Sequence, residues 1–365
     1  MFSAPHEFQK LALLALAVCL LAPAGAHAQT QPRFSAQFAS GKWLDGAELR
    51  GWHDREAEPR LDSRKLFFAG DRILWIEDNT ISPAAVPEAF VEFFGGDRLP
   101  GRVMEYQSGN ESPVRTSPPH LLVAPEAAVD WPDFRRLSGV PVLTRGLKRV
   151  VWQKRDDPRY RPGTLWYLDG RHLEFRALRW TSGAVRLLLE QETREVPFAE
   201  IAELHLPRID PWQVWFDQLA ALVPDVTGFV IQLETGDGVR ATASLARLNP
   251  AVRGDAGNPD HWIHGVQPAW CLEPLWLRHR AIRTRRFFAP HEAPLTAIEP
   301  NRAVQRSNLA GGWHWQLDRN VHSGALRCGD ALHKRWTALQ FDPGDDVELE
   351  AVEPTETYVI SLPAF

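Results

Sequence analysis

The sequence predicts an all-β protein built from tandem small antiparallel barrels or hairpin units, with one short helix. Four stretches of the chain repeat one pattern, in which a glycine-containing turn separates alternating apolar residues. Such turns are strong short-range signals for β-hairpins. The 365 residues also include 29 Pro and only 2 Met, a composition that argues against a helical bundle. One irregular β-sandwich whose hairpins are similar by chance is the alternative.

The first 28 residues (1–28) are predicted to be a cleaved secretory signal. Lys10 supplies a positive flank, residues 11–22 form an apolar core, and Ala26-His27-Ala28 has the small-x-small pattern of a cleavage site. A buried N-terminal helix is the alternative. No later apolar run approaches the roughly 18 residues that a membrane-spanning helix needs. We therefore expect a secreted or periplasmic, cell-envelope protein without a membrane span.

The repeat divides most of the remaining chain into four β units. The predicted units are residues 29–86, 87–158, 159–209 and 225–300. Their predicted turn glycines are Gly46, Gly96, Gly170 and Gly236. The spacing of these glycines is too uneven for a solenoid, so each unit is expected to carry its own loop insertions. The longest is the loop at 249–274 in the fourth unit.

One linking helix is predicted at residues 210–224. Asp210 can cap its N-terminus, Pro211 suits the first helical turn, and Pro224 would end it. The residues that would share its apolar face are Trp212, Trp215, Leu219 and Leu222. We expect this face to pack the third and fourth units together.

The composition excludes several functional classes. With 44% hydrophobic and 24% charged residues the chain is globular, and a net charge of −5 gives no reason to expect a nucleic-acid partner. Motifs of hydrolases, phosphate-binding loops and dinucleotide-binding folds are missing from the sequence. We therefore predict no catalytic residues, no metal site and no cofactor. His261 and His264 are interpreted as loop histidines satisfied by hydrogen bonds rather than as metal ligands.

An arginine-rich stretch at 277–288 (LRHRAIRTRRFF) has two interpretations. The favoured one is a solvated edge strand whose charge prevents pairing with another chain. The other is a basic face that clasps sulfated or uronic-acid polysaccharide, because guanidinium groups pair with planar anions.

The 15 Trp residues are the most suggestive chemical feature. Sugar rings stack their C–H faces on indole rings, but Trp also fills the small interiors of β units because it buries a large area. Trp75, Trp152, Trp166 and Trp180 lie in apolar strand contexts and are expected in the core. Exposed candidates for carbohydrate binding lie among Gly, Asn, His and Pro; they are Trp262, Trp270, Trp313 and Trp315.

Two cysteines remain after the predicted signal, Cys271 and Cys328. In an exported protein such a pair can form a disulfide. Two buried free thiols are the equally weighted alternative.

Residues 295–327 resemble the entry into the novel putative carbohydrate-binding module (NPCBM) of secreted planctomycete proteins. The similarity lies in Leu295-Thr-Ala-Ile-Glu-Pro300, in Gly311-Gly-Trp-His-Trp-Gln-Leu-Asp-Arg-Asn-Val321 and in Ser323-Gly-Ala-Leu-Arg327. The resemblance implies a partial, galactose-binding-like β-sandwich at 301–365 with a glycan-binding role. Its matching positions add Asp318 and Arg319 to Trp313 and Trp315 as carbohydrate candidates. Residues 333–339 depart from the strand that usually follows, so the module is expected to be truncated or degenerate.

The leading hypothesis is a secreted, non-enzymatic protein that binds cell-envelope or extracellular carbohydrate, with a polysaccharide or glycan as its partner. A structural or protein-interaction module of the cell envelope, with envelope proteins as partners, is the alternative. A glycosidase-type hydrolase is the third and least favoured hypothesis, because its carboxylates would follow no short sequence motif.

Overall fold

The computed structural model divides the chain into two units, Met1–Pro32 and Arg33–Phe365. It describes residues 32–289, except for 53–57, 68–69, 112–115, 128, 131–138, 158, 208, 223–228, 246–247 and 253–260, together with five short strands between 302 and 361. The predicted signal at 1–28 therefore lies outside the described residues.

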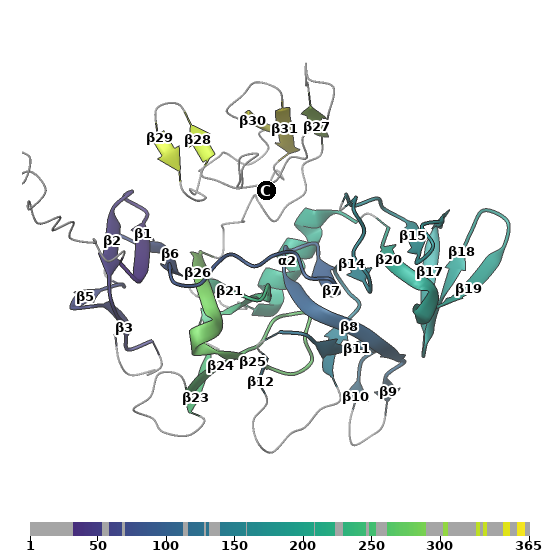
Figure 1. The fold of residues 1–365 in the computed structure, drawn as a ribbon, viewed down its shortest axis with the longest axis horizontal. Coiled ribbons are helices and arrows are strands. Elements are labelled where there is room, and N and C mark those ends of the chain that lie inside the picture. Colours follow the sequence, from purple (N-terminus) through teal and green to yellow (C-terminus); the bar gives the residue numbers. More distant parts are fainter. Residues whose placement is uncertain are drawn as a thin grey trace, which may run out of the picture. The chain divides into compact units, whose positions relative to one another are not determined.

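The all-β prediction is confirmed (Figure 1). The first predicted unit holds β1 (Phe34–Phe38), β2 (Trp43–Gly46), β3 (Leu49–Arg50), β4 (Arg60–Leu61), β5 (Arg64–Lys65) and β6 (Ile73–Asp78). The second holds β7 (Phe90–Phe93), β8 (Arg98–Gln107), β9 (Asn110–Glu111), β10 (Thr116–Ser117), β11 (His120–Pro125), β12 (Val129–Asp130), β13 (Val140–Leu143) and β14 (Leu147–Val151).

The third unit holds β15 (Thr164–Tyr167), β16 (His172–Glu174), β17 (Ala177–Thr181), β18 (Ala184–Leu188), β19 (Thr193–Pro197), a short 3₁₀ turn η1 (Phe198–Glu200) and β20 (Ile201–His205). The fourth holds β21 (Val230–Thr235), β22 (Arg240–Ser244), β23 (Asn249–Val252), β24 (Trp262–Val266), β25 (Leu275–Arg278), the 3₁₀ turn η4 (His279–Ala281) and β26 (Ile282–Phe288). The remaining strands are β27 (Arg302–Gln305), β28 (Leu326–Cys328), β29 (Ala331–His333), β30 (Asp346–Glu350) and β31 (Glu356–Ser361).

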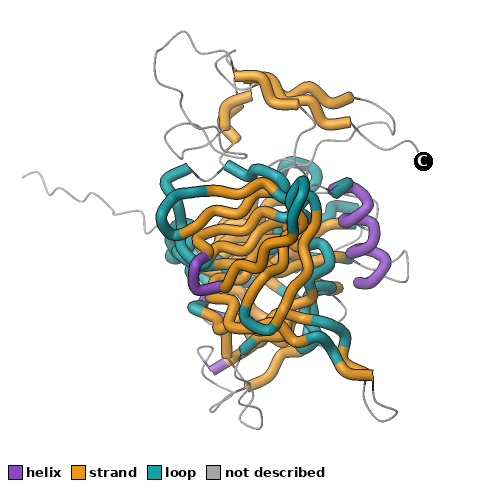
Figure 2. Tube along the Cα trace, turned by 90° about the vertical axis from the view of Figure 1, so that its right-hand side faces the viewer, coloured by secondary structure: helices purple, strands orange, loops and turns teal. Residues whose placement is uncertain are grey.

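The strands of the four units join edge to edge in one antiparallel 14-stranded sheet. The order along its path is β16-β15-β20-β14-β7-β8-β22-β21-β26-β6-β1-β2, with β11 and β13 attached through β8. Each unit supplies three consecutive places in this order: a hairpin of two strands and a later strand that pairs with the first of them. Figure 2 shows the strands of this sheet running side by side.

The four hairpins share one turn geometry, which identifies the true repeat. In each hairpin, the residue at the end of the first strand donates its N–H to the carbonyl oxygen of the residue four positions after it. The carbonyl oxygen of that same strand-end residue accepts the N–H of a glycine three positions after it. The four strand-end residues are Phe38, Phe93, Tyr167 and Thr235. The four glycines are Gly41, Gly96, Gly170 and Gly238, and all have φ between 81° and 97°. A residue at this position must adopt a left-handed conformation, which glycine does at little cost.

The predicted turns at Gly96, Gly170 and Gly236 are confirmed, whereas the turn at Gly46 was assigned wrongly. Gly46 lies inside β2, and the first hairpin turns five residues earlier at Gly41. In the fourth unit the left-handed residue is Gly238 rather than Gly236. An Asp-Gly pair forms a hairpin turn only where the strands before and after it pair with each other. The strand β2, which contains Asp45-Gly46, pairs instead with β1, which precedes it.

The predicted helix is confirmed as α2 (Pro211–Leu222), and Asp210 accepts a hydrogen bond from the N–H of Trp212. Its apolar face buries Trp215, whose ring meets Phe288 edge-on at 6.3 Å. Gln218 on the same helix reaches Asp97 in the second unit. The helix thus contacts the second and fourth units, and its predicted contact with the third unit stays a prediction.

The main core lies on one face of the large sheet. Residues that alternate along its strands, such as Ala36, Val91, Leu204 and Leu233, are fully buried in one apolar cluster. Burying these side chains supplies the main driving force for folding. The opposite face of the same strands carries polar side chains. In the part of the chain that the structure describes, no helix combines the length and apolar character needed to cross a membrane.

Smaller sheets complete the described structure. They are β3-β4-β5, β9-β10, β12-β25-β24-β23 and β17-β18-β19, with β27-β31-β30 and β28-β29 in the segment predicted to resemble the NPCBM.

Candidate functional site

A continuous row of polar side chains crosses the large sheet on the face opposite the core. It takes one residue from each strand of the sheet path, and each residue is the direct register partner of the next. In sheet order the row is Glu174, Thr164, His205, Arg149, Glu92, Arg98, Arg240, Glu234, Thr284, Glu77, Ser35 and Asp45. Directly opposed residues in antiparallel strands share a face and interact. The row is therefore one continuous feature, partly buried, that is assembled from all four units.

The centre of the row is a ladder of charges. Arg149 on β14 pairs with Glu92 on β7 at 2.5 Å. Burial raises the pKa of Glu92, but the positive charges of Arg149, Lys148 and Arg98 outweigh this effect and hold that pKa below its ordinary value. The carboxylate is therefore charged at neutral pH and serves as a counter-ion.

A second carboxylate in the row, Glu234, lies among three guanidinium groups. Its oxygens are 3.4 Å from Arg240, 3.8 Å from Arg283 and 3.7 Å from Arg286. Arg283 also donates to Glu77 at 2.6 Å. A register shift in the pairing of β26 with β21 places Arg283 between the two carboxylates.

The arginine-rich stretch 277–288 is therefore not a solvated edge strand as favoured from the sequence. Its second half forms β26, which pairs with β21 on one side and β6 on the other. Arg285 points to the core side and is 1% exposed, with its guanidinium over the ring of Trp52. Burial lowers the pKa of Arg285 to about 10. Alternation alone could not reveal that this strand pairs with β6 of the first unit as well as with β21 of its own unit.

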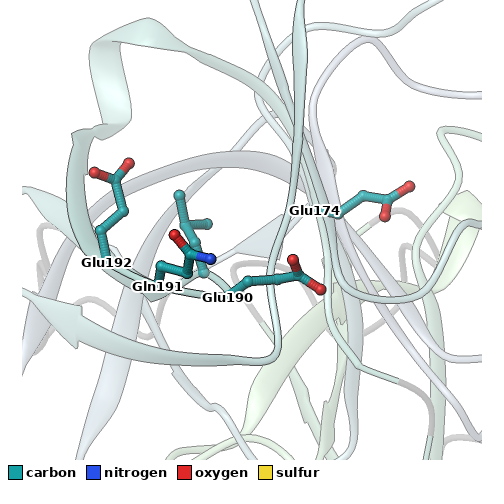
Figure 3. A pocket seen from close by; sticks show the side chains of 5 residues that line it. Glu174, Glu190, Gln191 and Glu192 are labelled. Atoms are coloured by element: carbon teal, nitrogen blue, oxygen red, sulfur yellow. The ribbon is translucent and has the colours of Figure 1, made fainter.

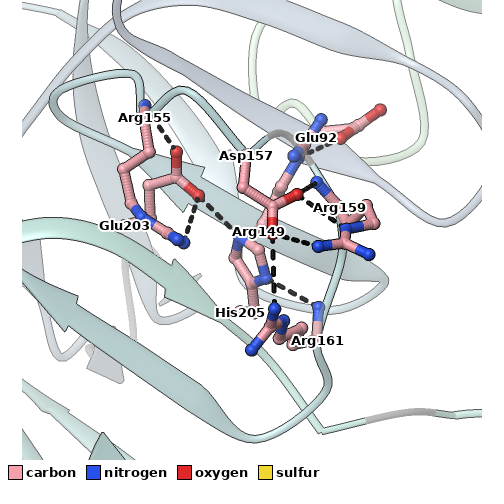
Figure 4. A network of polar contacts seen from close by, with 8 residues as sticks. All are labelled: Glu92, Arg149, Arg155, Asp157, Arg159, Arg161, Glu203 and His205. Atoms are coloured by element: carbon pink, nitrogen blue, oxygen red, sulfur yellow. Dashed lines mark hydrogen bonds and ion pairs between the residues drawn. The ribbon is translucent and has the colours of Figure 1, made fainter. Parts of the chain in front are cut away.

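Next to the ladder is a buried Glu203–His205 pair, drawn in Figure 4 with its neighbours. His205 Nε2 lies 2.9 Å from Glu203 Oε2, and its Nδ1 accepts the backbone N–H of Arg161 at 2.9 Å. The other oxygen of Glu203 accepts the N–H of Arg155. Burial is the main cause that lowers the pKa of His205, although Glu203 opposes it.

This geometry makes the pair structural rather than catalytic. A general base needs a ring nitrogen that can reach a substrate proton. Both nitrogens of His205 are engaged within the protein, and the side chain is fully buried. The pair holds the segment before β15 against β20 instead.

At the far end of the row, β2 presents an exposed indole. Trp43 is 45% exposed, and among residues with described side chains it is the one aromatic ring of that exposure. Its ring meets Trp75 edge-on at 5.1 Å, and Trp75 Nε1 donates to Gln37 Oε1 at 2.6 Å. The supporting ring is buried and hydrogen-bonded, so Trp43 packs against a fixed partner at the sheet edge.

A chain of hydrogen bonds lies beside this indole. Asn79 Nδ2 donates to Ser35 Oγ at 2.9 Å, and Ser35 Oγ donates to Asp45 Oδ1 at 2.7 Å. Asp45 is exposed, and among the described residues its Oδ2 accepts no hydrogen bond. Trp43 and Asp45 are two apart on β2, so they face the same side. The two residues define the Trp43 platform.

Sequence reasoning missed this platform although a signal for it existed. The segment Trp43-Leu44-Asp45-Gly46 alternates outward and inward, with Leu44 in the core. The assignment of Asp45-Gly46 to a turn concealed that alternation.

Two of the predicted carbohydrate candidates lie within the described residues. Trp262 opens β24 and is half-buried. Trp270 is a correction: it is 4% exposed, stacks on Phe93 at 4.6 Å and donates its Nε1–H to Asp97 at 2.7 Å. The predicted loop 249–274 contains the strands β23 and β24, and the segment after β24 folds back so that the Trp270 ring fills the core of the second unit. This ring therefore cannot serve as a sugar platform.

The remaining candidates, Trp313, Trp315, Asp318 and Arg319, lie outside the described residues and stay predictions. Cys271 is buried, 4% exposed, and its Sγ donates to the carbonyl oxygen of Pro141. The side chain of Cys328 is not among those described, so the pairing of the two cysteines also stays a prediction.

One of the two predicted loop histidines, His264, lies in β24 instead and pairs with a histidine of η4. His264 Nε2 lies 2.8 Å from His279 Nδ1, and His264 is buried. Across the described ranges, no three His, Cys, Asp or Glu side chains come together in a way that could hold a metal ion.

One surface pocket lies in the third unit, and another lies between the second and third units. The first, of about 600 Å³, is lined by Glu174, Leu189, Glu190, Gln191 and Glu192. Figure 3 shows the carboxylates of Glu190 and Glu192 diverging, and each is exposed and paired with an arginine. This arrangement is a charged turn and offers no convergent acid pair. The other pocket, of about 340 Å³, includes Tyr106 stacked on Trp180 at 6.4 Å.

No protein-family model matches this chain, and no curated protein and no solved structure is significantly similar to it. The resemblance of residues 295–327 to the NPCBM therefore stays a prediction.

Proposed function

We propose that this protein is a secreted or cell-envelope carbohydrate-binding protein and that the Trp43 platform is one of its glycan contacts. The observation that carries the proposal is the exposed indole of Trp43, packed against Trp75, beside the free acceptor oxygen of Asp45. The predicted secretory signal and the NPCBM-like stretch support the same function.

The chemistry of the platform suits a sugar. Pyranose rings combine an apolar C–H face with hydroxyl groups around the rim, so they need a flat apolar surface next to hydrogen-bond acceptors. The Trp43 ring supplies the surface. Because its edge contact with Trp75 restricts the indole before binding, less conformational entropy is lost when a sugar binds. Asp45 Oδ2 can accept a sugar hydroxyl, and such charge-assisted hydrogen bonds are about twice as strong as neutral ones.

Affinity electrophoresis of the mature protein through gels containing neutral or acidic polysaccharides tests the proposal. Wild-type protein should be retarded by at least one polysaccharide. Trp43→Ala should weaken that retardation about tenfold, the effect of losing roughly 1.4 kcal/mol of binding free energy. Asp45→Ala should weaken it several-fold, since it removes the acceptor and keeps the ring.

Trp212→Ala is the matched control because it removes a half-buried indole from α2, outside the platform. It should leave retardation unchanged. Far-UV circular dichroism of all variants verifies the fold. Absence of retardation of the wild type on every polysaccharide overturns the proposal. If Trp43→Ala is retarded as strongly as the wild type by a polysaccharide that the wild type binds, the Trp43 platform is not a glycan contact. A stoichiometric protein partner captured by the wild type and lost in Trp43→Ala, with no glycan affinity, supports the protein-interaction alternative instead.

A further inference from the structure

Two like charges face each other at the centre of the polar row. Arg98 on β8 and Arg240 on β22 are direct register partners, at the junction between the second and fourth units. Like charges directly opposite in a sheet are destabilising. Burial is the main cause that lowers the pKa of Arg98, and the neighbouring charges of Arg240 and Arg149 lower it further, against the opposing effect of Glu92.

The acceptors around this arginine pair are distant. Arg98 Nη2 is 3.6 Å from Glu92, and Arg240 Nη2 is 3.4 Å from Glu234. Arg240 Nη1 reaches the carbonyl of Gly96 at 3.4 Å. By contrast, Glu92 is 2.5 Å from Arg149 on its other side. The closest ion pair, Arg149–Glu92, therefore lies beside the central arginines. Arg98 and Arg240 share Glu92 and Glu234 with other arginines.

Some donors of the pair have no acceptor at all. The Nε atoms of both Arg98 and Arg240 are buried and lack a hydrogen-bond partner among the described residues. A guanidinium group carries five donors, and donors left unsatisfied in a buried place cost free energy. The central pair is thus deficient in acceptors as well as in negative charge.

Around the central pair, and counting it, the described arginines also outnumber the described carboxylates. The arginines of this part of the face are Arg98, Arg149, Arg240, Arg283 and Arg286, and the carboxylates are Glu77, Glu92 and Glu234. Among the described residues named here, five positive charges thus face three negative ones. An excess on a partly buried face attracts anions, because screening by water is weaker there than at a fully exposed surface.

We propose that the Arg98–Arg240 pair is a binding site for a tetrahedral oxyanion, a sulfate or phosphate group. Guanidinium groups bind such anions through paired N–H donors. The side chains of Arg98 and Arg240 are 22% and 29% exposed, so their outer Nη groups can be reached from solvent. The anion joins the second and fourth units across a junction where the strands share only one register pair. The site lies on strands other than β2 and does not depend on glycan binding at the Trp43 platform.

Isothermal titration of the wild type with sodium sulfate, at ionic strength held constant with sodium chloride, tests the site directly. We expect saturable binding of one sulfate and a rise in Tm relative to chloride. The double variant Arg98→Gln/Arg240→Gln should bind sulfate at least about tenfold more weakly. Arg171→Gln is the matched control, since Arg171 is an exposed arginine paired with Asp169 on another hairpin. It should bind sulfate like the wild type.

The stability of the double variant separates an anion site from a purely structural arginine pair. If the pair repels itself without an anion, the variant in chloride should unfold at the same Tm as the wild type or higher. A lower Tm in chloride together with unchanged sulfate binding overturns the proposal. So does the absence of sulfate-specific binding to the wild type.

A measurement on the wild type alone covers the case in which the variant fails to fold. Phenylglyoxal labels accessible arginines, and mass spectrometry reads each site. Sulfate should protect Arg98 and Arg240 at least severalfold and leave the labelling of Arg171 unchanged. Equal labelling with and without sulfate overturns the proposal. A sulfated oligosaccharide and free sulfate are then compared for their protection of Arg98 and Arg240. Protection by the oligosaccharide at a lower concentration of sulfate groups identifies a sulfated polysaccharide as the source of the anion. Equal protection per sulfate group identifies the free ion.

Discussion

The buried carboxylate of Asp97 should be the most sensitive single position in the described fold. It follows the turn glycine of the second unit and is 0% exposed. Its Oδ2 accepts the backbone N–H of Thr242 at 2.9 Å and the Nε1–H of Trp270 at 2.7 Å, and its Oδ1 accepts the hydroxyl of Thr242 at 2.6 Å. One side chain thus ties the second unit to a strand and a loop of the fourth.

Asp97→Ala leaves two buried donors, the Thr242 N–H and the Trp270 Nε1–H, without an acceptor. Each unsatisfied buried donor costs about 1–3 kcal/mol, so the free energy of unfolding should fall by about 2–6 kcal/mol. Typical domains are stable by only about 5–15 kcal/mol, and the variant should therefore be marginal. Asp97→Asn should lose only about 1 kcal/mol, because its oxygen can replace Oδ2 and its amide can donate to the Thr242 hydroxyl.

Urea unfolding of the mature protein, followed by tryptophan fluorescence and circular dichroism, measures both losses. Asp169→Ala is the matched control, a turn aspartate of the third unit that is exposed and paired with Arg171. It should change stability by less than about 0.5 kcal/mol. An Asp97→Ala variant within about 1 kcal/mol of the wild type would refute the reasoning.

The pH dependence offers a second check on Asp97. Burial is the main cause that raises its pKa, and the hydrogen bonds from Thr242 and Trp270 only partly offset this effect. The folded state therefore holds the proton more tightly than the unfolded state. Between the unfolded pKa and the raised folded pKa, the folded state binds more protons, so stability falls as pH rises. Asp97→Asn removes this contribution, and its stability relative to the wild type should improve from acidic to neutral pH.

Two further predictions concern Gly101 and Cys271. Gly101 has φ +145°, and a Cβ there would lie 2.3 Å from the carbonyl oxygen of Ala124, so Gly101→Ala should cost about 2 kcal/mol or more in urea unfolding. Gly183→Ala, with open space around it, should be neutral, and equal losses in both variants would contradict the argument. Burial raises the pKa of the Cys271 thiol to about 12, so it should not react with a thiol reagent at pH 8 until the protein is unfolded. Unfolded, unreduced protein without reactive thiols would instead show that Cys271 is in a disulfide.

The hairpins and the helix could be predicted because local chemistry determines them. Gly96 and Gly170 stand where the turn requires a left-handed residue, and Asp210 caps α2 through its own side chain. The first turn was misplaced because Asp45-Gly46 carries a stronger turn signal than Ser40-Gly41. A local signal does not reveal which strands pair, and only the pairing of β2 with β1 shows that Gly41 is the turn.

The candidate site was less predictable because it depends on register between distant strands. No sequence pattern connects Arg98 with Arg240 or Glu92 with Arg149. The first two meet because the second and fourth units join edge to edge, and the other two because the last strand of the second unit pairs with its first. For the same reason Trp270, which lies in a polar loop, could not be recognised as a core residue until Asp97 and Phe93 were placed beside it.

The sequence by itself thus determined the all-β class, the repeated hairpins and the capped helix, because backbone conformation follows from residues a few positions apart. Only the tertiary structure decided which of the two faces of each strand meets the core and which charges become neighbours. Those contacts depend on the pairing of strands that are tens of residues apart. That pairing turned the arginine-rich stretch at 277–288 from a solvated edge into β26, a buried strand of the sheet. It also left Trp43, rather than Trp270, as an exposed indole.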